Sequence, residues 1–251
     1  MKLNICSFNI RIDVESDGNN AWEFRKNKVA NFILKNDFDV IGFQEVNPSM
    51  HQSLIDELKN YETFGTPRSE NNELNPIFIK KNIFKVIDSN TYWLTRTPHT
   101  PSVIEGSHYP RIATYVVVED KNGDMLTFFN THFDYANDKI GLKQAKYFYK
   151  ELKKVEKEYK SSIIVTGDFN QIPDSKTMRY LNKKLNWVYD IREHVGLTFH
   201  GFTDEVEGFP IDYILFSKDF ILRSFVIGQH SGKNDFLSDH YPIFAHLEKE
   251  K

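Results

Sequence analysis

The segment Ser-Ile-Ile-Val-Thr-Gly-Asp-Phe-Asn at residues 162–170 joins a short apolar run to an acid and an amide. The run predicts a short buried strand that ends near Gly167. Phe169 lies between Asp168 and Asn170, so the side chains of these two residues point the same way if strand geometry persists. A carboxylate beside an amide suits holding a hard cation or orienting a water against a phosphate. Gly-Asp is also an ordinary turn, so the tetrad Gly-Asp-Phe-Asn needs partners before it indicates a site.

Other polar residues lie at the ends or mouths of strand-like segments, and we take six of them as candidate partners: Asn9, Glu45, His132, Asp212, Asp239 and His240. Each alone has an ordinary alternative, such as a turn, a helix cap or a surface position. Asp212 lies inside the apolar segment Ile211–Leu215, where an unpaired carboxylate is costly. His240 is its natural partner, because an acid can hold an imidazole in one tautomer. Their joint occurrence at strand ends indicates a functional site.

Composition limits the alternatives. The formal charge of −3 over 251 residues gives no overall basic field for wrapping nucleic acid, although it leaves a local basic groove open. Cys6 is the only cysteine, which excludes an intrachain disulfide and a thiolate metal cluster. We interpret it as a core thiol. The sequence has neither a long apolar run nor a signal-peptide pattern, so we expect a cytoplasmic protein without stable membrane insertion.

Strand-like and helix-like segments alternate without a low-complexity linker, which favours a single domain over residues 1–251. The middle of the chain predicts antiparallel strands and the flanks predict strand–helix–strand units, so we expect two sheets with helices outside. We expect a polar loop at 13–20. The expected strands are 3–9, 39–43, 61–66, 75–80, 83–95, 111–118, 125–133, 162–165, 211–217, 221–227 and 242–247. The expected helices are about 15 residues from Trp22, then 48–58, 140–157 and 175–184.

Seven motifs occur in order: Ser7-Phe8-Asn9-Ile10-Arg11, Phe43-Gln44-Glu45, Pro110-Arg111-Ile112-Ala113-Thr114, Asn130-Thr131-His132, Gly167-Asp168-Phe169-Asn170, Ile211-Asp212-Tyr213-Ile214 and Ser238-Asp239-His240. With them the chain resembles the endonuclease/exonuclease/phosphatase superfamily of metal-dependent phosphoesterases. The segment Thr198–Phe202 resembles a stretch of an uncharacterised bacterial branch. The resemblance implies an α/β (α+β) fold, a four-layer α/β/β/α sandwich of two mixed, mostly antiparallel sheets.

The resemblance also implies a Mg²⁺ ion, which Mn²⁺ should replace, on Glu45, Asn9 and Asp239. Asp168 would orient or deprotonate the attacking water, and Asn170 would hold that water and a phosphate oxygen. His240, braced by Asp212, would contact the scissile phosphate. His132 would be a second phosphate-binding or leaving-group histidine, with Glu73 as its acidic partner. Arg111 would contact the phosphate, or alternatively form an ion pair on its strand.

The implied activity is hydrolysis of a phosphoester bond by in-line attack of water. We expect a phosphodiesterase or phosphatase acting on a small or lipid-derived phosphoester, with no obligate protein partner. A DNA or RNA nuclease is the alternative, and it would need a groove from Lys80, Lys81, Arg96 and Arg111. An inactive binding module is disfavoured because no catalytic position is missing. Tyr92-Trp93 is the one candidate for contact with lipid, and we interpret it as core.

Overall fold

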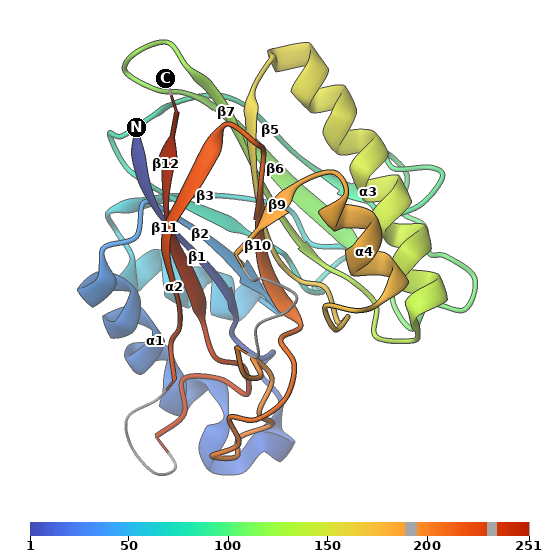
Figure 1. The fold of residues 1–251 in the computed structure, drawn as a ribbon. Helices are drawn as coiled ribbons and strands as arrows, with labels where there is room; N and C mark the ends of the chain where they lie inside the picture. Colours follow the sequence, from blue (N-terminus) through green and yellow to red (C-terminus); the bar gives the residue numbers. More distant parts are fainter. Residues whose placement is uncertain (189–194, 230–234, 251) are drawn as a thin grey trace.

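Two six-stranded sheets lie face to face, with helices on both outer sides (Figure 1). The computed structural model describes residues 1–188, 195–229 and 235–250. Each sheet has one parallel pair among its described strands, β1 with β2 and β7 with β8, and its other neighbours are antiparallel. The expected four-layer sandwich of two mixed, mostly antiparallel sheets is therefore confirmed.

Sheet 1 has the strand order β11-β12-β1-β2-β4-β3. Its strands are β1 (Lys2–Asn9), β2 (Val40–Gln44), β3 (Tyr61–Phe64), β4 (Ile77–Lys80), β11 (Phe220–Ile227) and β12 (Ile243–Lys249). β1 and β2 are buried over nearly their whole length, which fits central strands that are covered on both faces. The last strand of the chain, β12, thus pairs with the first strand, β1, inside this sheet.

Sheet 2 has the order β5-β6-β7-β8-β10-β9. Its strands are β5 (Lys85–Trp93), β6 (Ile112–Glu119), β7 (Met125–His132), β8 (Ser162–Asp168), β9 (Asn186–Trp187) and β10 (Asp212–Phe216). The Asn122-Gly123 turn between β6 and β7 has its glycine at φ 84°, as a tight hairpin requires. The long helix between β7 and β8 makes their parallel pairing possible.

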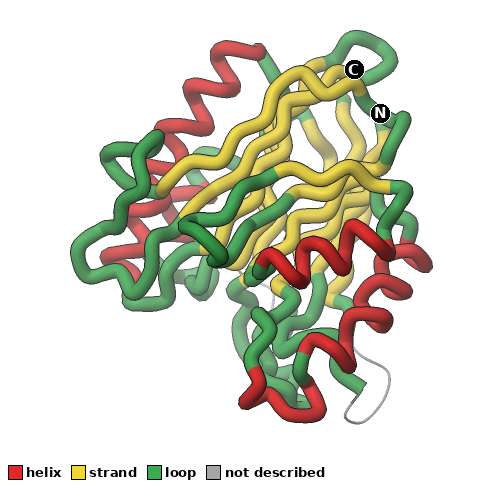
Figure 2. The backbone as a smooth tube through the Cα atoms, turned by 180° about the vertical axis from the view of Figure 1, so that it is seen from behind, coloured by secondary structure: helices red, strands yellow, loops and turns green. Residues whose placement is uncertain are grey.

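The helices cover the outer faces of the two sheets (Figure 2). α1 (Trp22–Asn36) and α2 (Pro48–Glu57) pack their apolar side chains on sheet 1, and α3 (Asp138–Tyr159) and α4 (Lys176–Asn182) pack theirs on sheet 2. Asn47 and Asn137 cap α2 and α3 by accepting a backbone N–H of the first turn. The space between the sheets is filled by apolar residues of both, among them Ile5 and Ile214, each with no exposed surface.

The predicted elements agree with the structure to within a few residues at their ends. The expected loop at 13–20 contains a short 3-10 helix (Glu15–Asn20), and the two-residue strand β9 was not predicted because so short a segment has no period. Cys6 and Tyr92 are buried, as expected, whereas Trp93 is only partly buried. No helix within the described residues has the length and apolarity needed to cross a membrane.

A buried polar cluster joins the two sheets close to the site. The amide of Gln44 donates to Oδ1 of Asn130 at 2.6 Å, and Oγ1 of Thr166 donates to the same oxygen at 3.1 Å. The amide nitrogen of Asn130 in turn donates to the backbone carbonyls of Phe43 and Pro76. Gly42 has no side chain here because a Cβ would clash with the two sheet-2 side chains. Polar bonds therefore fix the spacing of the sheets below the site.

Candidate active site

Strand ends from both sheets meet at one edge of the sandwich. β1 ends at Asn9, and its parallel neighbour β2 ends directly before Glu45. β7 and β8 run parallel with His132 opposite Asp168. β10 runs antiparallel to β8 and begins with Asp212 opposite Asp168, so its first residue lies at the same edge. The topology thereby gathers five of the predicted site residues that are far apart in sequence.

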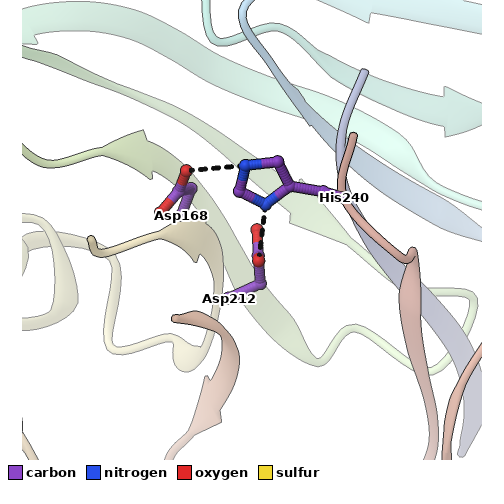
Figure 3. A group of neighbouring side chains, drawn as sticks. All are labelled: Asp168, Asp212 and His240. Carbon is purple, nitrogen blue, oxygen red and sulfur yellow. Dashed lines mark hydrogen bonds and ion pairs between the residues drawn. The ribbon is translucent and has the colours of Figure 1, made fainter. Parts of the chain in front are cut away.

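His240 lies between two buried aspartates (Figure 3). Its Nδ1 is 2.9 Å from Oδ2 of Asp212, and its Nε2 is 3.8 Å from Oδ2 of Asp168. Burial lowers the pKa of His240, but Asp212, together with the charges of Asp168 and Asp239, outweighs burial and raises it to about 10. The ring is therefore a cation at neutral pH, held by one acid and directed at the other. The predicted pairing of Asp212 with His240 is present in the structure.

Asp168 receives hydrogen bonds on both carboxylate oxygens. Oδ2 accepts from the amide nitrogen of Asn9 at 3.0 Å, and Oδ1 accepts from the backbone N–H of Asn170 at 2.8 Å. Burial raises the pKa of Asp168 to about 7, and the negative charge of Asp212 adds to the rise. A carboxylate with a pKa near neutrality can both accept and release a proton at working pH.

The expectation that Asp168 and Asn170 continue strand geometry is wrong. β8 ends at Asp168, and Asn170 has a left-handed backbone with φ 51°. Asn residues reach this region more easily than most, because their short polar side chain bonds locally. The side-chain nitrogen of Asn170 donates to the carbonyl of Phe133 and lies 3.0 Å from Nε2 of His132. Asn170 still reaches the same pocket, but through a turn.

The expected pairing of Glu73 with His132 is also wrong. Glu73 binds Arg68 at 2.8 Å, since a buried carboxylate needs a cation and the guanidinium is adjacent in the same loop. His132 instead approaches Asn170 and lies 3.5 Å from Oδ2 of Asp168 through Nε2. Burial lowers the pKa of His132, and the charge of Arg111 lowers it further, so the ring is neutral. Its Nδ1 has no hydrogen-bond partner among the described residues.

Glu45, Asn9 and Asp239, the three predicted metal ligands, lie near one another at this edge. Glu45 has a left-handed backbone with φ 60° and accepts from Nδ2 of Asn9 at 3.2 Å and from the backbone N–H of Ile12 at 3.0 Å. Oδ1 of Asn9 accepts the backbone N–H of Arg11 at 3.0 Å and keeps a second lone pair. Asp239 lies 3.7 Å from the guanidinium of Arg11.

The chemistry of this donor set fits a hard divalent cation. Burial raises the pKa of Asp239, and the nearby carboxylate of Glu45 raises it further. Two carboxylates that destabilise each other in a buried place are stabilised when a cation lies between them. Their oxygens, with the amide oxygen of Asn9, are the ligand types that Mg²⁺ and Mn²⁺ prefer.

Arg111 forms an ion pair, which was the second of its two alternatives, and its contact with the phosphate stays a prediction. Its Nε is 3.3 Å from Oδ2 of Asp134, and its guanidinium lies 5.4 Å from the ring centre of Tyr109. The side chain also lines the central pocket together with His132. Sequence reasoning missed Asp134, which follows β7 at two residues from His132; its position after a strand end was the available signal.

The gathered residues surround a cavity of about 480 Å³. Its lining is Arg11, Ile12, Glu45, Glu73, Tyr109, Arg111, His132, Tyr135, Asp168, Asn170, Phe199, Ile211, Asp239 and His240. Asn9 and Asp212 are not part of this lining, but they hold two lining residues in place: Asn9 donates to Asp168, and Asp212 bonds to His240. Arg11, Tyr135 and Phe199 were not assigned a role from sequence, although Arg11 is the last residue of the first motif and Tyr135 lies three residues after His132.

The basic groove considered for a nuclease is not formed as expected. Val40, the first residue of β2, pairs with Ile79, so Lys80 and Lys81 lie at the end of the sheet opposite Glu45. Lys80 forms an ion pair with Asp37 there, and neither lysine lines the central cavity. The antiparallel pairing of β2 and β4 is the physical reason, because it directs the end of β4 away from the end of β2.

Comparison with known proteins agrees with the fold. The profile of the Endonuclease/Exonuclease/phosphatase family matches residues 4–240. An uncharacterised protein of Acanthamoeba polyphaga mimivirus, L388, is 26% identical over 249 residues, with 83% of this chain and 89% of that protein covered. The endonuclease/exonuclease/phosphatase structure from Bacteroides vulgatus has a TM-score of 0.91 and 29% identity, with 100% of both chains covered.

A second solved structure is a mannosyl-6-phosphatase of Bacteroides thetaiotaomicron. Its TM-score is 0.90 at 24% identity, with 98% of this chain and 99% of that chain covered. At that identity the likeness shows a shared fold and leaves the substrate open. The match of the family profile over nearly the whole sequence shows that this chain belongs to the endonuclease/exonuclease/phosphatase family.

Proposed function

We propose that this protein is a Mg²⁺-dependent hydrolase of phosphoester bonds in which Asp168 directs a water molecule in line at the phosphorus atom. The observation that carries the proposal is the position of Asp168, whose Oδ2 lies 3.0 Å from Nδ2 of Asn9 and 3.8 Å from Nε2 of His240. One carboxylate thus adjoins the proposed metal side and the proposed phosphate side. The family to which the chain belongs is one of phosphoester hydrolases.

Glu45 and Asp239 would hold the cation, with Oδ1 of Asn9 as a further ligand. A bound Mg²⁺ would supply positive charge for the phosphate oxygens. Asn9 has a second task, because its amide nitrogen spans Oε1 of Glu45 and Oδ2 of Asp168. We infer that this amide keeps the water-directing carboxylate at a fixed place relative to the metal ligands.

Asp168 and His240 would have different roles at the phosphate: Asp168 would act on the attacking water, and His240 on the phosphate oxygens. Above its pKa of about 7, Asp168 accepts a hydrogen bond or proton from the attacking water. His240 stays protonated because of Asp212, so Nε2–H can stabilise negative charge that grows on the phosphate oxygens. Arg111 and Asn170 would contribute further donors, and neutral His132 would contact the phosphate or leaving group from the β7 side. Positioning and electrostatics then account for most of the catalysis.

A small phosphoester is favoured over a nucleic acid. The cavity has a volume of about 480 Å³, within the range of small-molecule sites. Among its lining residues the positive side chains are Arg11, Arg111 and His240, each beside residues proposed to hold the metal or the phosphate. Lys80 and Lys81 lie at the far end of sheet 1 and add nothing to a track for a charged backbone.

The test is hydrolysis of a panel of phosphate mono- and diesters, single-stranded DNA and RNA, with Mg²⁺ and with chelator. We expect turnover of at least one small ester in Mg²⁺, loss with chelator, and recovery with Mn²⁺. Asp168→Asn should lower turnover at least about a hundredfold, while Asp56→Asn on the exposed face of α2 should not change it. Turnover that survives chelator, or an Asp168→Asn variant within about tenfold of the parent, contradicts the proposal. Strong salt-sensitive cleavage of nucleic acid alone would move the substrate to that class.

A further inference from the structure

Aromatic side chains form part of the mouth of the central cavity. Tyr109, Tyr135 and Phe199 all line it, and their exposed fractions are 43%, 54% and 48%. Large aromatic side chains usually bury most of their surface, so three half-exposed rings around one cavity need an explanation. None of them is among the residues proposed above to hold the metal or the phosphate.

Tyr135 and Tyr109 are held by a shared buried carboxylate. Asp134 has no exposed surface, and it accepts the backbone N–H groups of His108, Tyr109 and Ala136, at 3.0–3.1 Å. The loop that carries Tyr109 is thereby fixed to the turn that carries Tyr135. The carboxylate also pairs with Arg111. Burial raises the pKa of Asp134, but the backbone N–H donors of His108 and Ala136, with the charge of Arg111, keep it below the usual value. The rings are therefore positioned before any ligand arrives.

The two tyrosine rings form a platform, which we define as Tyr109 and Tyr135 with the supporting ring of His108. His108 stacks on Tyr135 with the ring centres 4.5 Å apart and an interplanar angle of 23°. The centres of Tyr109 and Tyr135 are 6.4 Å apart and their planes are inclined by 55°, so a ligand ring can lie flat on one of them while the other borders its edge. Arg68 lies 4.7 Å from the centre of the Tyr109 ring. Each tyrosine is thus supported by a neighbour while about half of its surface stays exposed.

The platform is adjacent to the proposed phosphate position. Tyr135 follows His132 by three residues at the end of β7, and the guanidinium of Arg111 lies 5.4 Å from the ring centre of Tyr109. Phe199 lies beside His240, paired with it by a β-bridge and with its ring centre 5.0 Å from the imidazole. A group attached to the phosphate would meet an aromatic face on leaving the polar centre.

We propose that the platform is a leaving-group subsite that stacks on a sugar or base ring, so the substrate is the phosphate ester of a small ring-bearing alcohol. The inference rests on the proposed function and extends it to a substrate class. Aromatic faces bind the apolar face of a ring, and they add little for a short acyclic alcohol. Stacking of one base on an aromatic side chain changes affinity by about tenfold or more.

The experiment compares kcat/KM for three esters: a hexose phosphate, a nucleoside monophosphate and glycerol phosphate, the acyclic reference. In the parent we expect at least one ring-bearing ester to be preferred over glycerol phosphate. Tyr135→Ala should lower that preference about tenfold, chiefly through KM. Tyr135→Phe keeps the ring and should keep the preference. Phe24→Ala removes an aromatic side chain that is 53% exposed on α1, away from the cavity lining. It should change neither kcat/KM nor the preference for a ring-bearing ester.

The outcomes separate the two proposals. A preference for one ring-bearing ester over the other decides between a sugar and a base on the platform. An unchanged preference in Tyr135→Ala, or an equal loss in Tyr135→Phe, overturns the stacking subsite and leaves the proposed function in place. Absence of Mg²⁺-dependent hydrolysis of all three esters and of the wider panel overturns the proposed function, and the subsite with it. Melting temperatures of the variants should match the parent, because Tyr135 is half-exposed.

Discussion

The amide nitrogen of Asn9 donates to Oδ2 of Asp168 at 3.0 Å and so joins the end of β1 in sheet 1 to the end of β8 in sheet 2. The same nitrogen lies 3.2 Å from Oε1 of Glu45. One small side chain therefore contacts both the proposed water-directing carboxylate and the proposed principal metal ligand. The geometry of the site depends on how the two sheets are aligned. This hydrogen bond transmits that alignment directly to the proposed catalytic carboxylate.

The activity should have a plateau between two pH limits. Asp168 must lose its proton to act on water, and its pKa is about 7, so kcat/KM falls as the pH drops below 7. His240 must keep its proton, and its pKa is about 10, so kcat/KM falls as the pH rises above 10. Asn9→Ala removes a donor that favours the ionised form of Asp168, and the acidic limb should move to higher pH. An acidic limb that stays in place in Asn9→Ala contradicts the assignment.

Asp212→Asn should leave the fold intact and lower kcat by about 10²–10⁴-fold. The amide cannot balance the charge of His240, so burial, which lowers the pKa of this imidazole, is opposed only by the smaller effects of Asp168 and Asp239. The alkaline limb should therefore move from about 10 towards neutrality. The measurement is the pH dependence of kcat, with the melting temperature as the check on folding. A variant with reduced activity but an unmoved alkaline limb would show that Asp212 acts by another route.

Strand periodicity and ordered motifs were sufficient to predict the layers and the residues that reach the site edge. Asp212 is an example, because an acid inside an apolar strand needs a partner and His240 follows from that need. Contacts that depend on loop conformation were not predictable in the same way. Glu73 binds Arg68 within its own loop, and Asn170 turns back through a left-handed residue. Asp134 was missed because its three backbone partners come from two loops.

Glu45→Gln should abolish stabilisation by Mg²⁺. A ligand that binds only the folded state at a concentration of 100 times its Kd stabilises by about 2.7 kcal/mol, which corresponds to a rise of several degrees in Tm. The neutral amide removes one of two carboxylates proposed to hold the cation. The measurement is Tm with and without Mg²⁺ in the parent, in Glu45→Gln and in Glu57→Gln, an exposed control on α2. Equal shifts in all three proteins would place the cation elsewhere.

Asn130→Ala should destabilise the protein by at least about 3 kcal/mol. The amide nitrogen donates to two backbone carbonyls of sheet 1, and Oδ1 accepts from Gln44 and Thr166. All of these groups are buried, so removal of the amide leaves several polar atoms without partners. The measurement is urea unfolding, with the exposed Asn186→Ala as the control that should change stability by less than about 0.5 kcal/mol. A loss as small as that of the control would mean that water replaces the amide between the sheets.

Arg25→Met tests whether a buried cation positions the metal-side loops. The guanidinium is 1% exposed and donates to the backbone carbonyls of Asn20, Ile10, Leu237 and Arg11. Burial lowers its pKa to about 10, so it remains charged at neutral pH. Ile10 directly follows Asn9, and Leu237 lies two residues before Asp239. The side chain therefore ties together two segments that carry proposed metal ligands.

Methionine retains much of the apolar volume but donates nothing to these carbonyls. We expect unfolding free energy to fall by at least about 3 kcal/mol and the Mg²⁺-induced rise in Tm to shrink, because the ligand-bearing segments lose their shared anchor. Arg223→Met, which removes a half-exposed arginine paired with Glu248, should alter neither quantity appreciably. If stability falls but the Mg²⁺-induced rise in Tm is unchanged, Arg25 only attaches α1 to the rest of the fold. A diminished response measured well below the melting temperature would establish it as a positioning residue for the metal side.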